Sequence, residues 1–243
     1  MRIVKLDAID STNAYIKRTM RDSGLETNTV VVAHEQYNGR GQMGTYWESE
    51  PGKNLTFSVL KKFKDSKVSN QFYLSILVCL SVYETLNHLK IPDVHIKWPN
   101  DILSGNQKIC GVLIEPIVGG DMVKSAIIGI GLNVNQINFP KLSNVSSLKL
   151  LAGNSFDKDQ VLHLALIKLE KNFRYLTDLD FEWLLTKFEN HLYMKDETAS
   201  FEFKDGTLKE GRIRGITKEG KLRVEFDTKA IFEFGFKEVK LIY

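Results

Sequence analysis

The hydrophobic periodicity of the chain changes near Met194, and this change constrains the fold more than any other feature of the sequence. Before it, apolar residues alternate in some segments and recur at helical spacing in others, which indicates strands and helices in one domain. After it, short alternating segments are separated by Asp205-Gly206 and Glu219-Gly220, which are typical turn sequences. The sequence therefore predicts an α+β domain with a mixed β-sheet and helices, residues 1–194, followed by a small β-barrel, residues 195–243.

Strand and helix patterns can be placed along both parts of the chain. Apolar alternation or continuous apolar runs predict strands in the first part at residues 30–33, 54–60, 94–98, 109–115 and 122–134. Helical spacing predicts helices at residues 13–17, from residue 69 to a stop at Pro92, and at residues 157–176 and 181–192. Ser11 and Asp157 are placed to cap two of these helices. In the tail, strands are predicted at residues 198–203, 207–217, 221–226 and 231–242.

The composition excludes several classes of function. With 43% hydrophobic and 26% charged residues the chain is typical of a globular protein, and a net charge of +3 does not indicate a nucleic-acid or membrane partner. The most apolar stretch, residues 73–83, is too short to cross a bilayer, so we expect a cytoplasmic protein. Cys79 and Cys110 both lie among apolar residues and are predicted to be buried, reduced thiols rather than a disulfide or a zinc site.

Four segments contain polar residues that a hydrophobic core does not require. In the first, Asp10-Ser11-Thr12-Asn13, the side chains either cap a helix or present small donors and acceptors to a neutral polar ligand. The second has Gln36 followed by Gly39-Arg40-Gly41 and Gly44. Its glycines permit positive φ and close approach of the backbone, and Arg40 suits a carboxylate or phosphate, but the same loop is equally well explained as a turn.

The third segment, Lys97-Trp98-Pro99-Asn100-Asp101, follows a predicted strand and gathers a lysine, an amide and a carboxylate. Trp98 and Pro99 are unusual in a solvated turn, which favours a functional role over a turn with a surface ion pair. In the fourth segment, Lys108 lies beside an apolar strand with Gly111 three residues later. A lysine in such a place is usually only solvated, so this segment indicates little by itself.

Five motifs occur in one order along the chain: DSTN, Q-x-x-GRG-x-x-G-x-x-W, KWPND, K-x-x-G-V-L-x-E and Gly129-Ile-Gly-Leu-Asn133. Together they resemble the biotin protein ligases, and the resemblance covers essentially the whole chain. It implies a catalytic domain of the class II synthetase-like biotin/lipoate ligase type, followed by an SH3-like β-barrel.

The resemblance implies a two-step reaction. The biotin carboxylate attacks the α-phosphate of ATP to give biotinyl-5′-AMP and pyrophosphate, and a lysine of a biotin carboxyl carrier protein domain then attacks the acyl carbon. Because the first step brings an anion against a polyanion, cations must supply much of the stabilisation, and Mg²⁺ is expected to shield the triphosphate. The matching catalytic residues are Arg40, Lys97 and Lys108, with Asp101 either orienting the incoming lysine or capping its own turn.

The resemblance also implies ligand contacts for other residues and assigns no residue to a metal. The positions that match the biotin site are Ser11, Thr12, Asn13, Gln36, Gly39, Arg40, Gly41, Gln42, Lys108 and Gly111. The positions that match the ATP or adenylate site are Arg40, Trp47, Lys97, Asn100, Lys108, Gly131 and Asn133. We expect the loop of residues 39–47 to be mobile when empty and to be ordered by the adenylate, which it shields from water.

Several alternatives stay open at this point. Gln42 stands where many relatives carry a second basic residue, which leaves the strength of adenylate retention open. The chain starts at the catalytic domain without the helix-turn-helix domain of the bifunctional repressors, so we expect no DNA binding. The alternative functions are a lipoate-protein ligase or lipoyl transferase of the same fold, or a non-catalytic binding module. The identity of the carrier protein, and the choice between a monomer and a homodimer, are not predicted.

Overall fold

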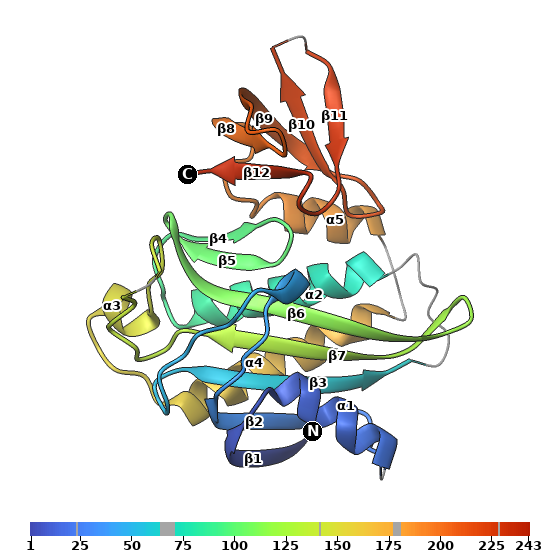
Figure 1. The fold of residues 1–243 in the computed structure, drawn as a ribbon, viewed down its shortest axis with the longest axis vertical. Coiled ribbons are helices and arrows are strands. Elements are labelled where there is room, and N and C mark those ends of the chain that lie inside the picture. Colours follow the sequence, from blue (N-terminus) through green and yellow to red (C-terminus); the bar gives the residue numbers. More distant parts are fainter. Residues whose placement is uncertain (23, 64–70, 141, 177–180, 228) are drawn as a thin grey trace.

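The structure of the protein, a computed structural model, describes residues 1–22, 24–63, 71–140, 142–176, 181–227 and 229–243. A large mixed sheet with helices on both faces forms the first part of the chain, and a smaller antiparallel sheet lies beyond one edge of it (Figure 1). The predicted fold class, an α+β domain followed by a small β domain, is confirmed.

Seven strands of the described residues form the main sheet, in the order β1-β2-β3-β7-β6-β5-β4. Their bounds are β1 Arg2–Ile9, β2 Thr29–Gln36, β3 Leu55–Lys62, β4 Val94–Lys97, β5 Asp101–Ser104, β6 Gln107–Gly119 and β7 Met122–Leu132. Strands β1 and β2 are parallel, and each of the other neighbouring pairs is antiparallel. The register places Asp101, Gly111 and Gly131 in one row across β5, β6 and β7, so three of the predicted motifs meet on the sheet.

Two strands of this sheet, β1 and β5, are not predicted by the sequence patterns. β1 is an edge strand whose residues are mostly exposed, so the alternation of its side chains is obscured by charged residues. β5 has only four residues, and its register shifts between Ile102 and Leu103. A strand this short and irregular shows no clear alternation of apolar residues. Asp101 therefore begins a strand directly after the turn of residues 98–100.

Five α-helices belong to the described part of the chain. They are α1 Thr12–Asp22, α2 Gln71–His88, α3 Leu148–Ala152, α4 Lys158–Phe173 and α5 Phe181–Glu189. α2 ends at His88, before Pro92, while its predicted start at residue 69 lies outside the described residues. Asp157 caps α4 as predicted, because its carboxylate accepts the amide hydrogens of Asp159 and Gln160. The short helix α3 is not predicted.

The predicted ends of two helices are wrong. Leu176 follows α4 in a 3-10 turn, Arg174–Leu176, and Leu192 follows α5 and forms a parallel bridge with Ile96 of β4. Both leucines keep the apolar spacing because they pack against the same core as the helix before them, and not because the helix continues.

The helices cover the two faces of the main sheet unequally. α2 and α4 pack on one face, α5 lies between α2 and the small domain, and the buried residues of the three helices join those of the sheet in one large core (Figure 1). α1 packs on the other face through Ile16, which meets Val31, Leu60 and Ile127. Much of this second face is therefore left to other parts of the chain. Cys79 and Cys110 are buried and free, as predicted, and burial raises the pKa of both thiols.

The small domain is an antiparallel sheet of five strands in the order β11-β10-β9-β8-β12. Its strands are β8 Thr198–Phe203, β9 Leu208–Ile216, β10 Leu222–Phe226, β11 Ile231–Phe234 and β12 Val239–Ile242. The prediction of one strand over residues 231–242 is wrong, because a turn in which Lys237 has a φ of 60° divides it into β11 and β12. Phe201, Ile213 and Val224 are fully or almost fully buried and continue the core of the main domain.

The two domains are joined by polar contacts that involve the end of α5. The Glu189 carboxylate accepts the amide hydrogen of Ile216 in β9, with an O···N distance of 2.7 Å, and lies against Gly215. The backbone of Tyr193 donates to the carbonyl of Ile96, so the segment after α5 runs beside β4. The proposed domain boundary after Met194 falls in this segment.

We expect Glu189→Ala to lower the free energy of unfolding by about 1–3 kcal/mol, because the buried amide of Ile216 loses its acceptor. Glu182→Ala is the matched control: Glu182 is also in α5 and pairs with Lys218 of the small domain, but that pair is exposed to solvent, so its loss should cost much less. Urea unfolding of both variants measures the difference. Equal losses would contradict the role given to Glu189.

Candidate functional site

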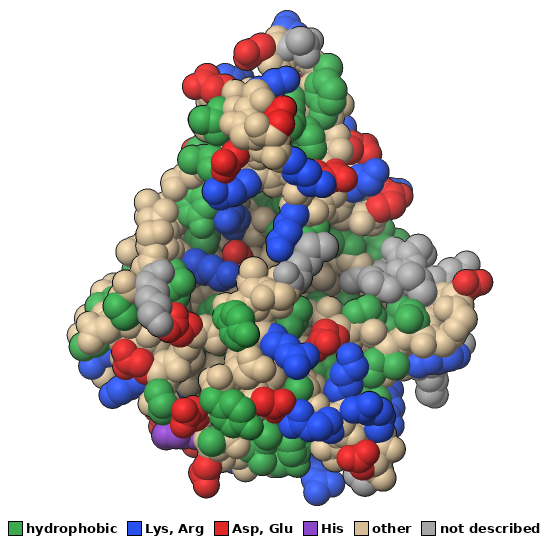
Figure 2. Space-filling view, viewed as in Figure 1, with side chains coloured by type: hydrophobic (Ala, Val, Ile, Leu, Met, Phe, Trp, Pro, Cys, Tyr) green, Lys and Arg blue, Asp and Glu red, His purple; other side chains and the backbone are tan. Residues whose placement is uncertain are grey.

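A cavity of about 570 Å³ lies between the main sheet, the loop of residues 39–47 and the small domain. Its walls come from the start of α1, from β4, β5, β6 and β7, and from strands of the small domain, including β8 and β12. Basic side chains surround the opening, beneath the small domain (Figure 2). Its size is within the range of about 300–1,000 Å³ that is usual for small-molecule sites.

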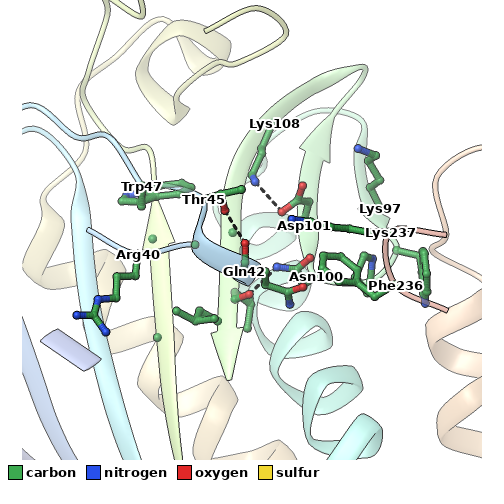
Figure 3. Close-up of a pocket in the computed structure, with 18 of the residues that line it drawn as sticks. Arg40, Gln42, Thr45, Trp47, Lys97, Asn100, Asp101, Lys108, Phe236 and Lys237 are labelled. Carbon is green, nitrogen blue, oxygen red and sulfur yellow. Dashed lines mark hydrogen bonds and ion pairs between the residues drawn. The ribbon is translucent and has the colours of Figure 1, made fainter. Parts of the chain in front are cut away.

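Lys108 and Asp101 form an ion pair in this cavity, with the lysine Nζ 2.7 Å from the carboxylate Oδ1 (Figure 3). The two residues lie on the neighbouring strands β6 and β5, which the hairpin brings side by side. Lys108 also lies 5.8 Å from the ring centre of Trp47. Asp101 is thus held by a lysine of the neighbouring strand.

Lys97 lies close to this pair, directly opposite Asp101 in the register of β4 and β5. Its ammonium lies 3.3 Å from the hydroxyl oxygen of Tyr243, to which it donates, and 4.4 Å from the centre of that ring. Burial lowers the pKa of Lys97, the charge of Asp101 opposes this, and Lys108 adds to the lowering. Two lysines therefore share one carboxylate in a partly buried site, and an anionic ligand would be stabilised there.

The glycine loop of residues 39–47 is folded back on itself. Gly41 donates to the carbonyl of Thr45, and the amide of Trp47 donates to the carbonyl of Gly39. A side chain at Gly39 would meet Trp47, and one at Gly41 would meet Thr45, so these two glycines serve close approach. Of the three glycines, Gly44 alone has a positive φ, 81°. A three-residue 3-10 helix, Gln42–Gly44, forms the turn.

Arg40 does not join the two lysines in the structure. Its side chain is exposed and points away from Lys108 and Asp101, although the residue lines the edge of the cavity (Figure 3). The Arg40 charge instead contributes to lowering the pKa of Asp10. The prediction that Arg40 acts beside Lys97 and Lys108 therefore requires the loop to move.

Trp47 covers the glycine row of the sheet. A Cβ at Gly131 would collide with its indole ring, and one at Gly111 would make a tight contact with the same ring, so Trp47 occupies the space that these glycines leave. The indole Nε1 is buried and has no hydrogen-bond partner among the described residues, and the same holds for the side-chain oxygen of Asn133. Buried polar atoms without partners are rare and often mark a ligand site.

A second polar cluster lies at the start of α1. Ser11, Thr12 and Asn13 are all buried and line the cavity. The Gln36 side-chain oxygen accepts the amide hydrogen of Thr12 at 2.8 Å, and the Ser58 hydroxyl lies 2.6 Å from both the Thr12 hydroxyl and the Asn13 side-chain oxygen. This end of the cavity offers neutral hydrogen-bonding groups, whereas the lysine end is charged.

The structure places most of the predicted site residues around the cavity, with three differences. Gly39 and Asn133 do not line it, although Gly39 contacts Trp47. The Asn100 amide donates to the carbonyl of Val112 at 2.6 Å, which is a structural contact between β6 and the turn before β5. Arg40 points away, as described above.

The small domain also contributes residues to the cavity, and none of them is predicted from the sequence. The charged residues among them are Glu202, Lys204, Lys237, Glu238 and Lys240. Lys240 pairs with Glu202 at 2.9 Å. No motif or spacing marks these residues, because their position depends on how the two domains pack. Among the described residues there is no cluster of three or more His, Cys, Asp or Glu that could hold a metal ion, and none of the helices could span a membrane.

The fold and the cavity define a class of protein: a mixed α+β domain with a cavity of small-molecule size, lined by lysines at one end, between its main sheet and an SH3-like domain. Residues 6–133 match the model of the biotin/lipoate A/B protein ligase family. The chain belongs to this family.

Individual relatives agree with this assignment. The chain is 31% identical over 223 residues to the bifunctional ligase/repressor BirA of Bacillus subtilis, covering 90% of this chain and 68% of the relative. It is 34% identical over 127 residues to the biotin–[acetyl-CoA-carboxylase] ligase of Paracoccus denitrificans, covering 51% of each. Among solved structures, the biotin protein ligase of Aquifex aeolicus with biotin and ATP matches with a TM-score of 0.81 and 26% identity, covering 99% of this chain and 98% of that one.

Asp10, next to the polar cluster, is held by Arg18 of α1 with N···O distances of 2.7 and 2.9 Å. This contact lowers the Asp10 pKa from 3.8 to about 2. The contribution to stability is therefore present above pH 4 and is lost as the pH falls through 2. We expect Asp10→Asn to cost on the order of 1–2 kcal/mol at pH 7 and almost nothing near pH 2.

Urea unfolding at several pH values checks this. Asp121→Asn, in the exposed turn between β6 and β7, is the control and should leave the free energy of unfolding almost unchanged. A cost for Asp10→Asn that is the same at pH 7 and near pH 2 would contradict the ion-pair origin of the effect.

Proposed function

We propose that the protein is an ATP-dependent biotin protein ligase, which activates biotin as biotinyl-5′-AMP and transfers it to a lysine of a biotin carboxyl carrier protein domain. The observation that carries the proposal is the Lys108–Asp101 ion pair with Lys97 beside it, at the charged end of a cavity whose other end is neutral and polar. The names of the relatives and the bound ligands of the matching structure support the choice of biotin and ATP.

In the first step, the carboxylate of the acid and the phosphates of ATP meet at the lysine end. Lys108 exchanges its Asp101 partner for the incoming anion, and Lys97 stabilises the charge that develops at the α-phosphate. Lys204 and Lys237 of the small domain line the same cavity and would add positive charge near the phosphates of ATP. Preorganised cations of this kind act in the transition state without further reorganisation.

In the second step, a neutral amine must attack the activated carbonyl. A lysine amine has a pKa of about 10.4 in solution and arrives protonated. Once Lys108 contacts the ligand, the Asp101 carboxylate is released and can orient the incoming ammonium and help remove its proton. The proposed role of Asp101 in transfer therefore follows from its role as the partner of Lys108 before ligand binding.

The neutral parts of the ligand are assigned to uncharged groups of the cavity. Thr12 and Gln36 face the ureido ring, with Ser11 and Asn13 beside them. The unpartnered Nε1 of Trp47 and Oδ1 of Asn133 are the groups that the adenylate would satisfy, with Gly131 beneath the indole. Gly39, Gly41 and Gln42 form the loop that brings Arg40 toward the adenylate on closure.

Mg²⁺ is proposed to arrive with the triphosphate of ATP, which it usually accompanies. No three acidic or metal-binding side chains gather in the described residues, so the protein would hold the ion through the nucleotide and not through a cage of its own. We propose the cytoplasm as the location of the protein, since ATP is available there.

The test is the release of pyrophosphate from ATP by the purified protein, with biotin, lipoate and octanoate offered in turn. We expect release with biotin, and we expect Lys108→Ala to lower it by about 100-fold or more, because the anion loses its charged partner. Lys62→Ala, an exposed lysine at the end of β3, is the control and should retain full activity.

The other outcomes separate the alternatives. Release with lipoate in place of biotin would assign the protein to the lipoate ligases of the same fold. No release with any of the three acids would leave a non-catalytic binding module. Transfer is checked separately, by mixing the protein with biotin, ATP and a carrier domain and following the mass of the carrier.

A further inference from the structure

Four side chains form a continuous hydrogen-bonded chain behind the neutral end of the cavity. The Glu115 carboxylate lies 2.9 Å from the Asn13 amide nitrogen, the Asn13 oxygen lies 2.6 Å from the Ser58 hydroxyl, and that hydroxyl lies 2.6 Å from the hydroxyl of Thr12. Thr12, Asn13 and Ser58 are buried. Thr12 and Asn13 line the cavity, but Ser58 and Glu115 do not.

The direction of each hydrogen bond in this chain follows from Glu115. An ionised carboxylate only accepts hydrogen bonds, so the Asn13 amide must turn its NH₂ group toward Glu115 and its oxygen toward Ser58. The amide oxygen also only accepts, and therefore the single hydroxyl hydrogen of Ser58 is donated to it. Ser58 has no hydrogen left for Thr12.

The hydroxyl hydrogen of Thr12 must then fill the short contact with Ser58. At 2.6 Å, two hydroxyl oxygens without a hydrogen between them would repel each other, so Thr12 donates and Ser58 accepts. The longer contact of 3.1 Å between the Thr12 hydroxyl and the Gln36 oxygen receives no hydrogen. That oxygen is already satisfied by the amide of Thr12 at 2.8 Å.

The consequence is a fixed polarity at the cavity surface. Because its hydrogen points toward Ser58 and away from the cavity, the Thr12 hydroxyl offers the cavity only lone pairs and acts as an acceptor. The Gln36 side chain uses its oxygen on Thr12, which leaves its NH₂ group as a donor beside this acceptor. An acceptor next to a donor is complementary to an N–H next to a C=O in the ligand.

We propose that Ser58 and Glu115 are positioning residues, which act through Asn13 to hold the Thr12 hydroxyl as an acceptor and so select a ligand with an N–H group at that place. A cyclic urea such as that of biotin has this group, and a purely apolar ring does not. The inference rests on the proposed function and names the chemical basis of its specificity. The two residues contribute without contacting the ligand.

The test compares biotin with an analogue in which one ureido N–H is replaced by oxygen, a cyclic carbamate of nearly the same shape, in both isomers. Binding is measured by calorimetry with the full chain. In the unmodified protein, we expect one isomer to bind about 30-fold more weakly, because two acceptors face each other. In Ser58→Ala, the Thr12 hydroxyl is free to turn and donate, and we expect the ratio to fall to about threefold.

Variants of Glu115 test the same series of hydrogen bonds at the end that lies away from the cavity. In Glu115→Ala the Asn13 amide can flip and reverse each bond, so the discrimination against the carbamate should fall as in Ser58→Ala. In Glu115→Gln a side-chain oxygen can still accept from Asn13, and the discrimination should be kept. Glu115 is partly exposed, so its substitution should be tolerated by the fold. The Glu115 variants therefore test the hydrogen-bond series even if Ser58→Ala does not fold.

Thr56→Val is the matched control. Thr56 lies two residues before Ser58 on β3, is equally buried, and donates only to the carbonyl of Ala33. It should lose stability without changing the biotin-to-carbamate ratio. An unchanged biotin-to-carbamate ratio in both Ser58→Ala and Glu115→Ala would overturn the inference. If the protein still binds biotin in that case, the proposed function stays in place. Failure of the unmodified protein to bind biotin would overturn both.

Discussion

The ion pair between Lys108 and Asp101 is the interaction on which the rest of the site depends. It exists because β5 and β6 form a hairpin, and the register of that hairpin sets Asp101 against Gly111 while Lys97 lies opposite Asp101 on β4. One carboxylate therefore serves two lysines, and burial already lowers the pKa of Lys97. A site with this imbalance favours an anionic ligand, and an anion that enters would weaken the hold of Lys108 on Asp101. In the proposed function, binding of the acid and release of the Asp101 carboxylate are therefore two sides of one exchange.

The small domain takes part in the site as well as in the fold. Trp98, from the KWPND motif, donates through its indole to the carbonyl of Gly220, and its ring meets Phe236 at 6.4 Å. Tyr243 contacts Lys97, and Lys237 lines the cavity. A domain of this size is marginally stable alone, so its orientation is set by these contacts and by Glu189. Changes in domain packing would then alter the charge around the lysines as well as the stability.

The parts of the site that the sequence predicts are those that are close in the chain or on adjacent strands. Lys97, Asp101, Lys108 and Gly111 lie within one three-stranded segment, so short-range spacing is enough to bring them together. Arg40 was predicted at the same place but points elsewhere, because the direction of its side chain depends on the conformation of the loop (Figure 3). The lysines of the small domain could not be predicted, since their position depends on packing between domains. In the fold, the edge strand β1 was missed because it is mostly exposed, and β5 was missed because it is short and irregular.

The two ends of the cavity together restrict the ligand more than either end does. The lysine end requires an anion, which many acids supply, including lipoate and octanoate. The end formed by Thr12 and Gln36 consists of buried polar groups, and a ligand that covers them without hydrogen-bonding them incurs their full desolvation cost. A site that must satisfy such groups rejects an apolar analogue more strongly than an apolar pocket rejects a polar one. In the proposed function, specificity for a urea-containing acid would therefore come from the hydrogen bonds behind the cavity, whereas the chemistry would depend on the lysines at its other end.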